Sequence, residues 1–400
     1  MHKIPLARPD ITNKEKEAVL GALETSSLSL GKKYIEFQSL MAKYAGVKYA
    51  VAVNSGTSGL HLIIRALGIG KGDEVITTPF SFVSSSNCIL YERAKPVFVD
   101  IKSDTFNINP ELVEGLITPQ TKAILAVDVF SQPANWKELR GIAKKHKLFL
   151  IEDSAEALGS EYSPPTNFGL NNGGKKADWK NNSKLVGGKG KRCGGFGDAG
   201  VFAFFPNKQI TTGEGGMILT NNKKIYELCQ SMANQGREFS GGEWLKHERL
   251  GYNYRLDEMS CAMGIVQMKR LKKIMIKRAR VASIYNRKLK GIKDLEVPYI
   301  KPGNKLSWFV YVVKLNNKFA GKKRDKIIEK MAKKGIQCSN YFQSIHLQPF
   351  YKKKFGYKDG DFPVSENTSK RTLALPFFNN LTEKEINFIV KSLKNAIQSF

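Results

Sequence analysis

Short apolar runs alternate with helical patterns from about residue 48 to residue 220, and this alternation constrains the fold more than any other feature of the chain. The runs are nearly continuous in apolar residues, which is typical of strands buried on both faces of a sheet. The pattern predicts an α/β fold in which a mainly parallel, seven-stranded sheet lies between helices such as 58–67 and 136–145. The predicted strands are 49–53, 74–77, 96–100, 123–127, 148–152, 199–204 and 217–220.

The two ends of the chain are mainly helical in pattern. Thr12 with Glu15, and Thr382 with Glu385, each have the spacing of a capping box and predict helix starts. A helix over 34–44 follows the first start. The predicted elements after residue 255 are a long helix over 256–289, a strand over 307–315, a helix over 324–334, a strand over 336–342 and the last helix.

These elements predict three regions. Residues 1–30 are expected to form an arm and helix at the domain junction, 31–255 a large α/β domain, and 256–400 a smaller C-terminal α/β domain. The stretch 162–195 is rich in Gly, Asn and Lys, so it is predicted to be a long surface insertion. Its GKGK run does not satisfy the phosphate-loop pattern.

Lysine and arginine outnumber aspartate and glutamate by 64 to 36, which gives a net charge of +28. Such an excess can favour nucleic acid, anionic membranes or anionic small molecules. The basic residues are spread along the chain without interleaved aromatics, so a lysine-rich solvated surface is the simpler interpretation. Neither a nucleic-acid nor a membrane partner is expected.

Several classes of protein are excluded by composition. The chain has 400 residues, 42% of them apolar and 25% charged, as in soluble globular proteins of two or more domains. Five scattered cysteines without a CxxC pair, and the lack of an HExxH motif, indicate no metal site. The start MHKIPLARPD has no secretory apolar stretch, so we expect a cytoplasmic enzyme.

Four loops at predicted strand ends or helix starts carry residues suited to chemistry. The first, NSGTSG at 54–59, precedes a helix whose first amides favour an anion, so it is a phosphate turn or a plain strand-to-helix turn. The second contains Asp153 at the end of the LFLI strand. This carboxylate either pairs with a cationic ring nitrogen or caps a helix.

The third loop, FPNKQITTGEGG, places Lys208 between two strands. A lysine forms a Schiff base when it is held unprotonated against a carbonyl, whereas an isolated loop lysine is usually solvated. The fourth loop, GYNYR at 251–255, opens the long helix. Asn253 and Arg255 either reach an anion or belong to a simple turn.

Taken in order, these loops resemble the sugar aminotransferases of the DegT/DnrJ/StrS type, which are fold type I pyridoxal-phosphate enzymes. The resemblance covers nearly the whole chain. The segments that carry it are IPLARPDIT, AVAVNSGTSGLHL, GDEVITTPFSFV, VFVDI, VFSQPAN, IEDSAEALGSEY, FGDAGVFAFFPNKQITTGEGGMILTN, LGYNYRLDEMSCAMG, IHLQPFY and TLALPFFNNLT.

The resemblance implies pyridoxal 5'-phosphate as the cofactor and assigns roles around it. Lys208 matches the Schiff-base lysine, and Asp153 matches the acid that pairs with the pyridinium nitrogen, so these two are the expected catalytic residues. Glu156 matches the Gln or Glu beside the ring hydroxyl. Gly56 and Thr57 match the phosphate-binding turn.

Other matches concern the cofactor ring, the partner subunit and the substrate. Phe82 matches an aromatic residue that stacks on the cofactor ring. Asn253 matches a residue that reaches the cofactor phosphate from the neighbouring subunit, so a homodimer with shared active sites is expected. Tyr341, His346 and Gln348 match substrate-side residues, and packing within the small domain is the alternative for these three.

Three features depart from the family's pattern. Ala203 stands five residues before the lysine, where the family often has Ser, so one phosphate contact is missing. Asp128 and Ser131 stand where many members have His and Gly. The insertion over 162–195 exceeds the short loop that is usual before FGDAG.

By resemblance, the chain moves an amino group from glutamate or glutamine to a nucleotide-linked 3- or 4-keto-6-deoxyhexose, for amino-sugar and surface polysaccharide or lipopolysaccharide biosynthesis. Related dehydratases share the fold and the cofactor but carry His in place of the lysine, so Lys208 argues against that alternative. A basic nucleic-acid-binding or regulatory protein with a vestigial cofactor site is the alternative from another class, and only the net charge supports it. The sequence does not distinguish the sugar, its carbon position, the nucleotide or the donor.

Overall fold

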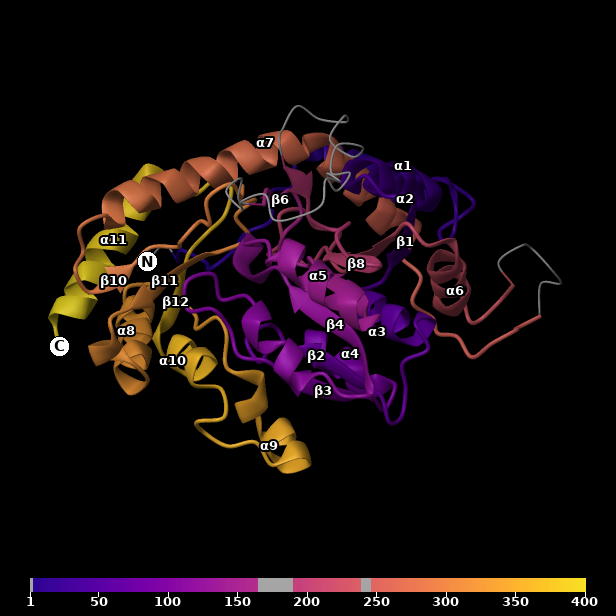
Figure 1. Ribbon diagram of the computed structural model, residues 1–400. Coiled ribbons are helices and arrows are strands. Elements are labelled where there is room, and N and C mark those ends of the chain that lie inside the picture. The colour runs from indigo at the N-terminus through magenta and orange to yellow at the C-terminus, as the bar shows by residue number, and fades with distance from the viewer. Residues whose placement is uncertain (1–2, 165–189, 239–245) are drawn as a thin grey trace, which may run out of the picture.

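A seven-stranded sheet forms the centre of the larger part of the molecule (Figure 1). The computed structural model describes residues 3–164, 190–238 and 246–400. The strand order is β1-β9-β8-β5-β4-β2-β3, and only β9 runs against its neighbours, so the predicted mainly parallel sheet is confirmed. The strands are β1 (Tyr49–Val53), β2 (Glu74–Thr77), β3 (Lys95–Phe98), β4 (Thr121–Val127), β5 (Phe149–Asp153), β8 (Ala199–Ala203) and β9 (Gly216–Thr220).

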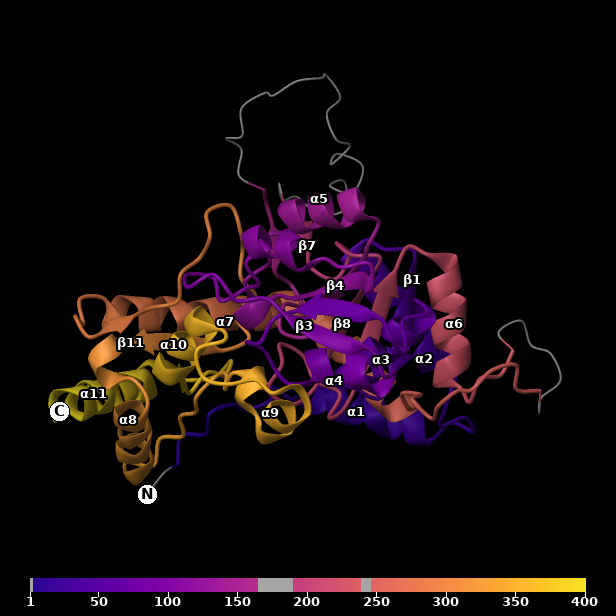
Figure 2. The same cartoon turned by 60° about the horizontal axis from the view of Figure 1, so that its bottom comes forward.

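Helices cover both faces of this sheet because alternate strand residues point to opposite sides. Val51 of β1 packs with one helical layer and Ala52 with the other. Figure 2 shows α5 on one side of the strands, with α3 and α4 on the opposite side. One layer contains α3 (Gly56–Ala66), α4 (Ser84–Tyr91) and α6 (Lys223–Ala233), and the other contains α2 (Lys32–Ala45), α5 (Trp136–His146) and α7 (Glu258–Leu289).

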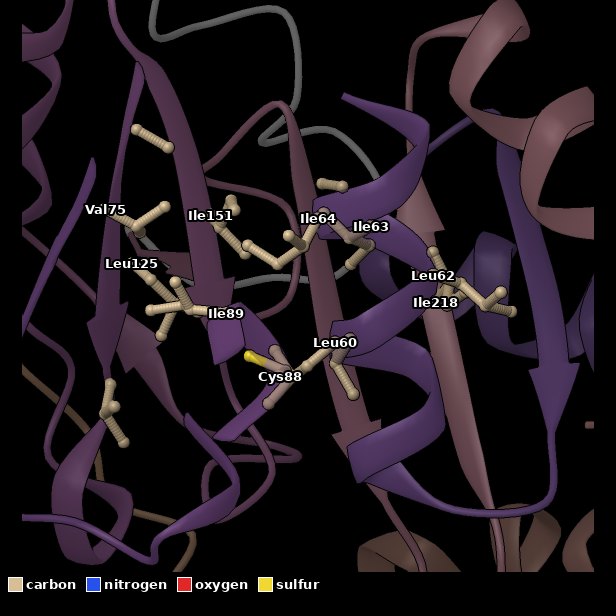
Figure 3. Packing of buried hydrophobic residues seen from close by; sticks show 14 of the residues in the cluster. Leu60, Leu62, Ile63, Ile64, Val75, Cys88, Ile89, Leu125, Ile151 and Ile218 are labelled. Carbon is tan, nitrogen blue, oxygen red and sulfur yellow. The ribbon is translucent and has the colours of Figure 1, made fainter. Parts of the chain in front are cut away.

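The contact between α3, α4 and the sheet illustrates why these strands are apolar throughout (Figure 3). Leu60 and Ile63 of α3 and Ile89 of α4 are fully or almost fully buried against strand residues that include Leu125 and Ile151. Burying such side chains contributes roughly 1.5–3 kcal/mol each. This layer therefore holds the start of α3 rigidly at the end of β1.

Capping side chains decide where several helices begin. The two predicted capping boxes are present, at the start of α1 (Asn13–Leu23) and of α11 (Glu383–Gln398). Asp257 caps α7 by accepting a hydrogen bond from the amide of Ser260 at 2.8 Å, so this helix begins two residues later than predicted. Ser55 caps α3, which therefore begins two residues earlier than predicted.

The C-terminal part has its own antiparallel sheet and its own core. Its strand order is β10-β11-β12, and α7 runs along both parts (Figure 1). The predicted strand at 307–315 is shorter, since only its second half forms β11. The elements of this part are β10 (Leu295–Glu296), β11 (Tyr311–Leu315), α8 (Lys322–Lys333), α9 (Pro349–Phe355), α10 (Pro363–Arg371), β12 (Thr372–Leu375) and α11.

The predicted strand over 336–342 is wrong. Ile336 and Ser339 form only isolated bridges, to Ile4 and Ala374. The chain then leaves the sheet and stacks Phe342 on Phe130, with ring centroids 5.3 Å apart. Packing of aromatic side chains against the larger part therefore replaces a regular ladder here.

Two predictions about organisation stay predictions. The boundaries at residues 30 and 255 are not tested by the arrangement of the elements. Most of the predicted insertion, 165–189, lies outside the described residues. Its two ends pair as β6 (Glu161–Tyr162) and β7 (Lys191–Arg192). Among the described residues, no helix combines the length and apolar character needed to cross a bilayer.

Candidate active site

The loops predicted to carry chemistry meet at one edge of the sheet. The strands β1, β5 and β8 end there, and ligands of such sheets bind beyond the carboxyl ends of the strands. A cavity of about 1490 Å³ lies at this edge. The predicted site residues that line it are Gly56, Thr57, Phe82, Asp153, Glu156, Lys208, Tyr341 and Gln348.

Lys208 lies on the wall of the cavity with its side chain 13% exposed. Its Nζ is 3.8 Å from Oε1 of Glu156 and 4.0 Å from the ring centroid of Phe309. Burial lowers the pKa of the Lys208 ammonium, and the carboxylates of Glu156 and Asp153 oppose this shift. The amine therefore loses its proton more readily than a surface lysine, as a nucleophile or base requires.

Asp153 is the last residue of β5 and is almost completely buried. Its Oδ2 accepts a hydrogen bond from Oγ of Ser85 at 2.7 Å, and its Oδ1 accepts one from the amide of Ala155 at 3.1 Å. Burial raises the pKa of this carboxyl group, and the two hydrogen bonds lower it. A cationic group of a ligand would hold Asp153 in its charged form.

Glu156 forms the side of the cavity next to Lys208. Its Oε2 accepts a hydrogen bond from the amide of Phe130 at 2.9 Å. Burial raises the pKa of Glu156, and the charge of Lys208 lowers it. The carboxylate can therefore accept a hydrogen bond from a ligand hydroxyl while it faces the amine.

The start of α3 is the turn that the sequence predicts to bind a phosphate. The amides of Gly56 and Thr57 lie in the first helical turn, where backbone donors have no intrahelical acceptor and the helix dipole favours an anion. A Cβ on Gly56 would lie 2.8 Å from Cβ of Ala203, so the turn and β8 approach too closely for a larger residue. Glycine therefore suits this position, and Ala203 leaves no hydroxyl to contact a phosphate.

Of the remaining predicted residues, some line the cavity and others lie outside it. Phe82 is 62% exposed at the rim, while Tyr341 and Gln348 line the cavity. Asn253 lies outside it, with its carbonyl oxygen accepting a hydrogen bond from Asn54 at 3.4 Å. Its predicted role needs a second subunit and stays a prediction.

His346 differs from its predicted place at the substrate side. Its side chain is fully buried, and its Nε2 lies 3.1 Å from Oε1 of Glu366. Its ring also packs against Phe362, with centroids 4.7 Å apart. The structure therefore brings Tyr341 and Gln348 to the cavity but not His346, because packing within the C-terminal part holds it.

Two residues beside the predicted ones escaped the sequence analysis. Ser85 contacts Asp153, and Phe309 contacts Lys208. Ser85 lies in a serine-rich helix start, and Phe309 lies in an apolar run that precedes a strand, so neither carries a local signal. Only the folded arrangement brings them to the site.

Asp128 stands where many members of the family have His. It belongs to a buried hydrogen-bond network behind Asp153. Oγ of Ser154 lies 2.6 Å from Oδ2 of Asp128 and 2.7 Å from Oε1 of Glu152. One hydroxyl hydrogen cannot serve both carboxylates, so one of them carries a proton. Glu152 also accepts the amides of Gly194 and Phe196, which favours its charged form.

Burial raises the pKa of both carboxyl groups, and the charge of Glu152 raises that of Asp128 further, well above its ordinary value. We therefore assign the proton of this network to Asp128. Its Oδ1 accepts hydrogen bonds from the amide of Ala134 and from Nε1 of Trp136, at 2.8 and 3.0 Å. The atoms of Asp128, Glu152 and Cys193 also lie within 4.8 Å of one another. The carboxyl oxygens of Asp128 and Glu152 already have hydrogen-bond partners within the protein.

We expect Asp128→Asn to be tolerated and to flatten the pH dependence of stability. Because the folded protein keeps a proton that the unfolded chain loses near pH 4, stability falls as pH rises towards the raised pKa. The wild-type slope from this group is at most about 1.4 kcal/mol per pH unit. An asparagine amide keeps the same hydrogen bonds without titrating, and urea unfolding at several pH values measures the difference.

Glu152→Gln is the matched comparison. Its amide cannot accept both backbone N–H groups, so it should cost about 1–3 kcal/mol at every pH. If Asp128→Asn costs as much as Glu152→Gln and leaves the slope unchanged, the proton does not reside on Asp128.

Comparison with known proteins agrees with this geometry. The sequence profile of the DegT/DnrJ/EryC1/StrS aminotransferase family matches residues 9–394. Spore coat polysaccharide biosynthesis protein SpsC of Bacillus subtilis is 32% identical over 406 residues, which cover 99% of this chain and 98% of the relative. GDP-perosamine synthase of Escherichia coli O157:H7 is 32% identical over 394 residues, which cover 98% of each chain.

A solved structure is similar over its whole length. Helicobacter pylori PseC, described as an aminotransferase involved in the biosynthesis of pseudoaminic acid, superposes with a TM-score of 0.87. It is 29% identical, and the match covers 100% of both chains. The predicted resemblance and fold type are therefore confirmed, and the chain belongs to the DegT/DnrJ/EryC1/StrS aminotransferase family.

Proposed function

We propose that this chain is a pyridoxal-phosphate-dependent aminotransferase that moves an amino group from glutamate or glutamine to a nucleotide-linked keto-sugar. One observation carries the proposal. The primary amine of Lys208, the buried carboxylate of Asp153 and the helix start at Gly56 and Thr57 all line the same cavity. The similarity to GDP-perosamine synthase and SpsC supports a product used in surface polysaccharide.

The amine, the carboxylate and the helix start match three functional groups of pyridoxal phosphate: its aldehyde, its ring nitrogen and its phosphate. Lys208 would bond its aldehyde, Asp153 would hold its ring nitrogen protonated, and the amides of Gly56 and Thr57 would bind its phosphate. Phe82 at the rim would stack on the ring, and Glu156 would accept its hydroxyl. When bound, the cofactor supplies an electron sink for the electrons released at the substrate carbon.

Lys208 then has a second task as the base. With the cofactor in place, the Lys208 Nζ would be positioned to take the proton from the α-carbon of the amino donor. The same amine would return a proton to the sugar carbon that receives nitrogen in the second half of the reaction. The lowered pKa of Lys208 suits both directions.

The size of the cavity supports a substrate larger than a simple keto acid. About 1490 Å³ exceeds the roughly 300–1,000 Å³ of typical small-ligand pockets. Its outer end is lined by Tyr91, Phe350 and Lys354, and both aromatic rings are more than half exposed. We assign this end to the nucleoside diphosphate, with the base on an aromatic ring and a phosphate near Lys354.

Lys354→Gln should raise the KM for the nucleotide-linked sugar about tenfold, which corresponds to ~1.4 kcal/mol. The KM for the amino donor should not change, because the donor reacts at the inner end. Lys353→Gln is the control, since this neighbouring lysine on α9 is exposed but does not line the cavity. Equal effects of the two substitutions on KM would contradict the assignment.

The proposal includes a homodimer in the cytoplasm. Leu20, Leu23, Ile35 and Leu250 are each at least half exposed, and Leu250 precedes the GYNYR loop that holds Asn253. Exposed apolar side chains of this kind favour association, here with a second copy whose Asn253 would reach the cofactor phosphate. All five cysteines are free thiols, as suits a reducing compartment.

The first half of the reaction tests the proposed function without any sugar. Protein loaded with pyridoxal phosphate should release one 2-oxoglutarate per subunit when glutamate is added, while the visible absorbance of the bound aldehyde disappears. The release should then stop until a keto-sugar is supplied. If no amino donor alters the absorbance or yields a keto acid, the aminotransferase proposal is wrong.

A further inference from the structure

The residue after Lys208 carries a buried amide that no step of the proposed reaction uses. Gln209 is 3% exposed. Its Nε2 donates hydrogen bonds to the carbonyl oxygen of Glu156 at 2.6 Å and to Oγ of Ser307 at 2.7 Å. Gln209 therefore joins the lysine loop to both segments that face the lysine amine.

The hydroxyl donors of this network can be ordered from its distances, and Nε2 of Gln209 also lies 3.2 Å from Oγ of Ser131. The hydroxyl of Ser160 donates to the carbonyl oxygen of Ser131 at 2.8 Å. Oγ of Ser307 lies 3.0 Å from Oγ of Ser160, so Ser307 must donate in that pair. The order is therefore from the Gln209 amide to Ser307, from Ser307 to Ser160, and from Ser160 to Ser131.

Ser131 closes the network around Lys208. Its Oγ donates to the carbonyl oxygen of Glu156 at 2.7 Å and accepts the amide of Phe309 at 2.7 Å. Ser131 and Ser160 are fully buried and Ser307 almost so. A buried network with satisfied donors favours one arrangement of the segments that it joins.

Those segments carry the two groups that lie next to the lysine amine. Oε1 of Glu156 is 3.8 Å from Nζ of Lys208, and the ring centroid of Phe309 is 4.0 Å from it. Phe309 arrives from the start of the C-terminal sheet, about a hundred residues beyond Lys208. The network through Gln209, Ser307 and Ser131 ties it to the loops after β4 and β5.

We propose that Gln209 is a positioning residue, which holds Glu156 and Phe309 in place next to the Lys208 amine and keeps water from it. The role of Lys208 itself rests on the proposed function. The holding role of Gln209 concerns this chain's own side chains and can be measured without the cofactor.

The protonation of Lys208 reports on this arrangement. The charged groups that act on it are the carboxylates of Glu156 and Asp153, and Tyr341 and Glu214 line the same cavity. Burial is the largest influence on the pKa of Lys208 and lowers it. Loosening Phe309 admits water, so the pKa should rise towards that of an exposed lysine.

The experiment measures how fast Lys208 is acetylated by acetic anhydride at different pH values in cofactor-free protein, with its peptide followed by mass spectrometry. Gln209→Leu, whose side chain is one atom shorter, keeps an apolar side chain at this position but removes the donors. We expect the midpoint of Lys208 labelling to move upward by at least about half a pH unit. Ser307→Ala, which should disturb folding less, is expected to move it in the same direction.

Gln267→Leu is the matched control. Gln267 is also buried, and its Nε2 donates hydrogen bonds to the carbonyl oxygen of Asp10 and to Oε1 of Glu15. These contacts are not part of the network around Lys208. It should lose stability without moving the Lys208 midpoint. The double variant Gln209→Leu with Phe309→Leu should shift the midpoint by less than the sum of the single shifts, because both act on the same side of the amine.

An unchanged midpoint in folded Gln209→Leu and Ser307→Ala would overturn the proposal, as would equal shifts in Gln267→Leu. The proposed function has a separate outcome. If the shifts occur but wild-type protein never bonds pyridoxal phosphate, Gln209 positions the lysine and the proposed reaction is wrong.

Discussion

Lys208→Ala should lower the rate of amino transfer by at least about 10⁴-fold. In the proposed reaction two tasks disappear together, because the amine would be both the attachment point for the cofactor and the group that moves the proton. The loss should appear in kcat, since Lys208 contacts the reacting atoms and not the outer end of the substrate. Single-turnover release of 2-oxoglutarate from glutamate measures it without interference from sugar binding.

A control separates lost chemistry from lost structure. Thermal unfolding of Lys208→Ala should stay near that of the wild type. Without the charge of Lys208 the pKa of Glu156 rises, so this carboxyl group takes up a proton and does not remain as an unpaired buried charge. Methylamine added to the variant should restore part of the proton transfer, as a small free base that fits the vacated space. Wild-type rates in the variant would show that another residue carries the base role.

Asp153→Asn should lower kcat by about 10²- to 10³-fold, while the protein still binds pyridoxal phosphate. A carboxylate at this position stabilises a proton on the ring nitrogen, and the amide cannot supply that charge. The ring then withdraws electrons less strongly when the α-proton leaves. Stopped-flow measurement of the glutamate half-reaction in the wild type and the variant gives the ratio.

Ser85→Ala provides the graded comparison for Asp153. It removes the 2.7 Å hydrogen bond to Oδ2 but leaves the carboxylate, so its effect should be about tenfold or less. The pKa of Asp153 should also rise, because this hydrogen bond lowers it. If Asp153→Asn is no worse than Ser85→Ala, the charge of Asp153 does not serve the reaction.

The central sheet could be predicted because its strands are buried on both faces. Each of the seven predicted strands lies within two residues of the observed one, since a continuous apolar run leaves little choice of position. The C-terminal part was harder to predict. The run at 336–342 has the composition of a strand, but its aromatic side chains pack against Phe130 instead.

The site was predictable where a residue's role depends on its place at a strand end. Asp153 ends β5 and Lys208 lies in the loop after β8, so neighbouring parallel strands bring them to one edge. His346 shows the limit, because a motif does not reveal that the side chain is buried against Glu366. Gln209 and Phe309 acquire their roles only through contacts between segments far apart in the sequence.

The most direct test of the proposed aminotransferase activity is to follow the transfer of nitrogen itself. Protein loaded with pyridoxal phosphate would be mixed with ¹⁵N-glutamate and a GDP- or UDP-linked 4-keto-6-deoxyhexose, and the sugar product analysed by mass spectrometry. We expect a labelled amino sugar that forms in the same amount as 2-oxoglutarate. The Lys208→Ala variant should form none. Release of 2-oxoglutarate with no labelled sugar from any nucleotide-linked keto-sugar would contradict the proposed activity.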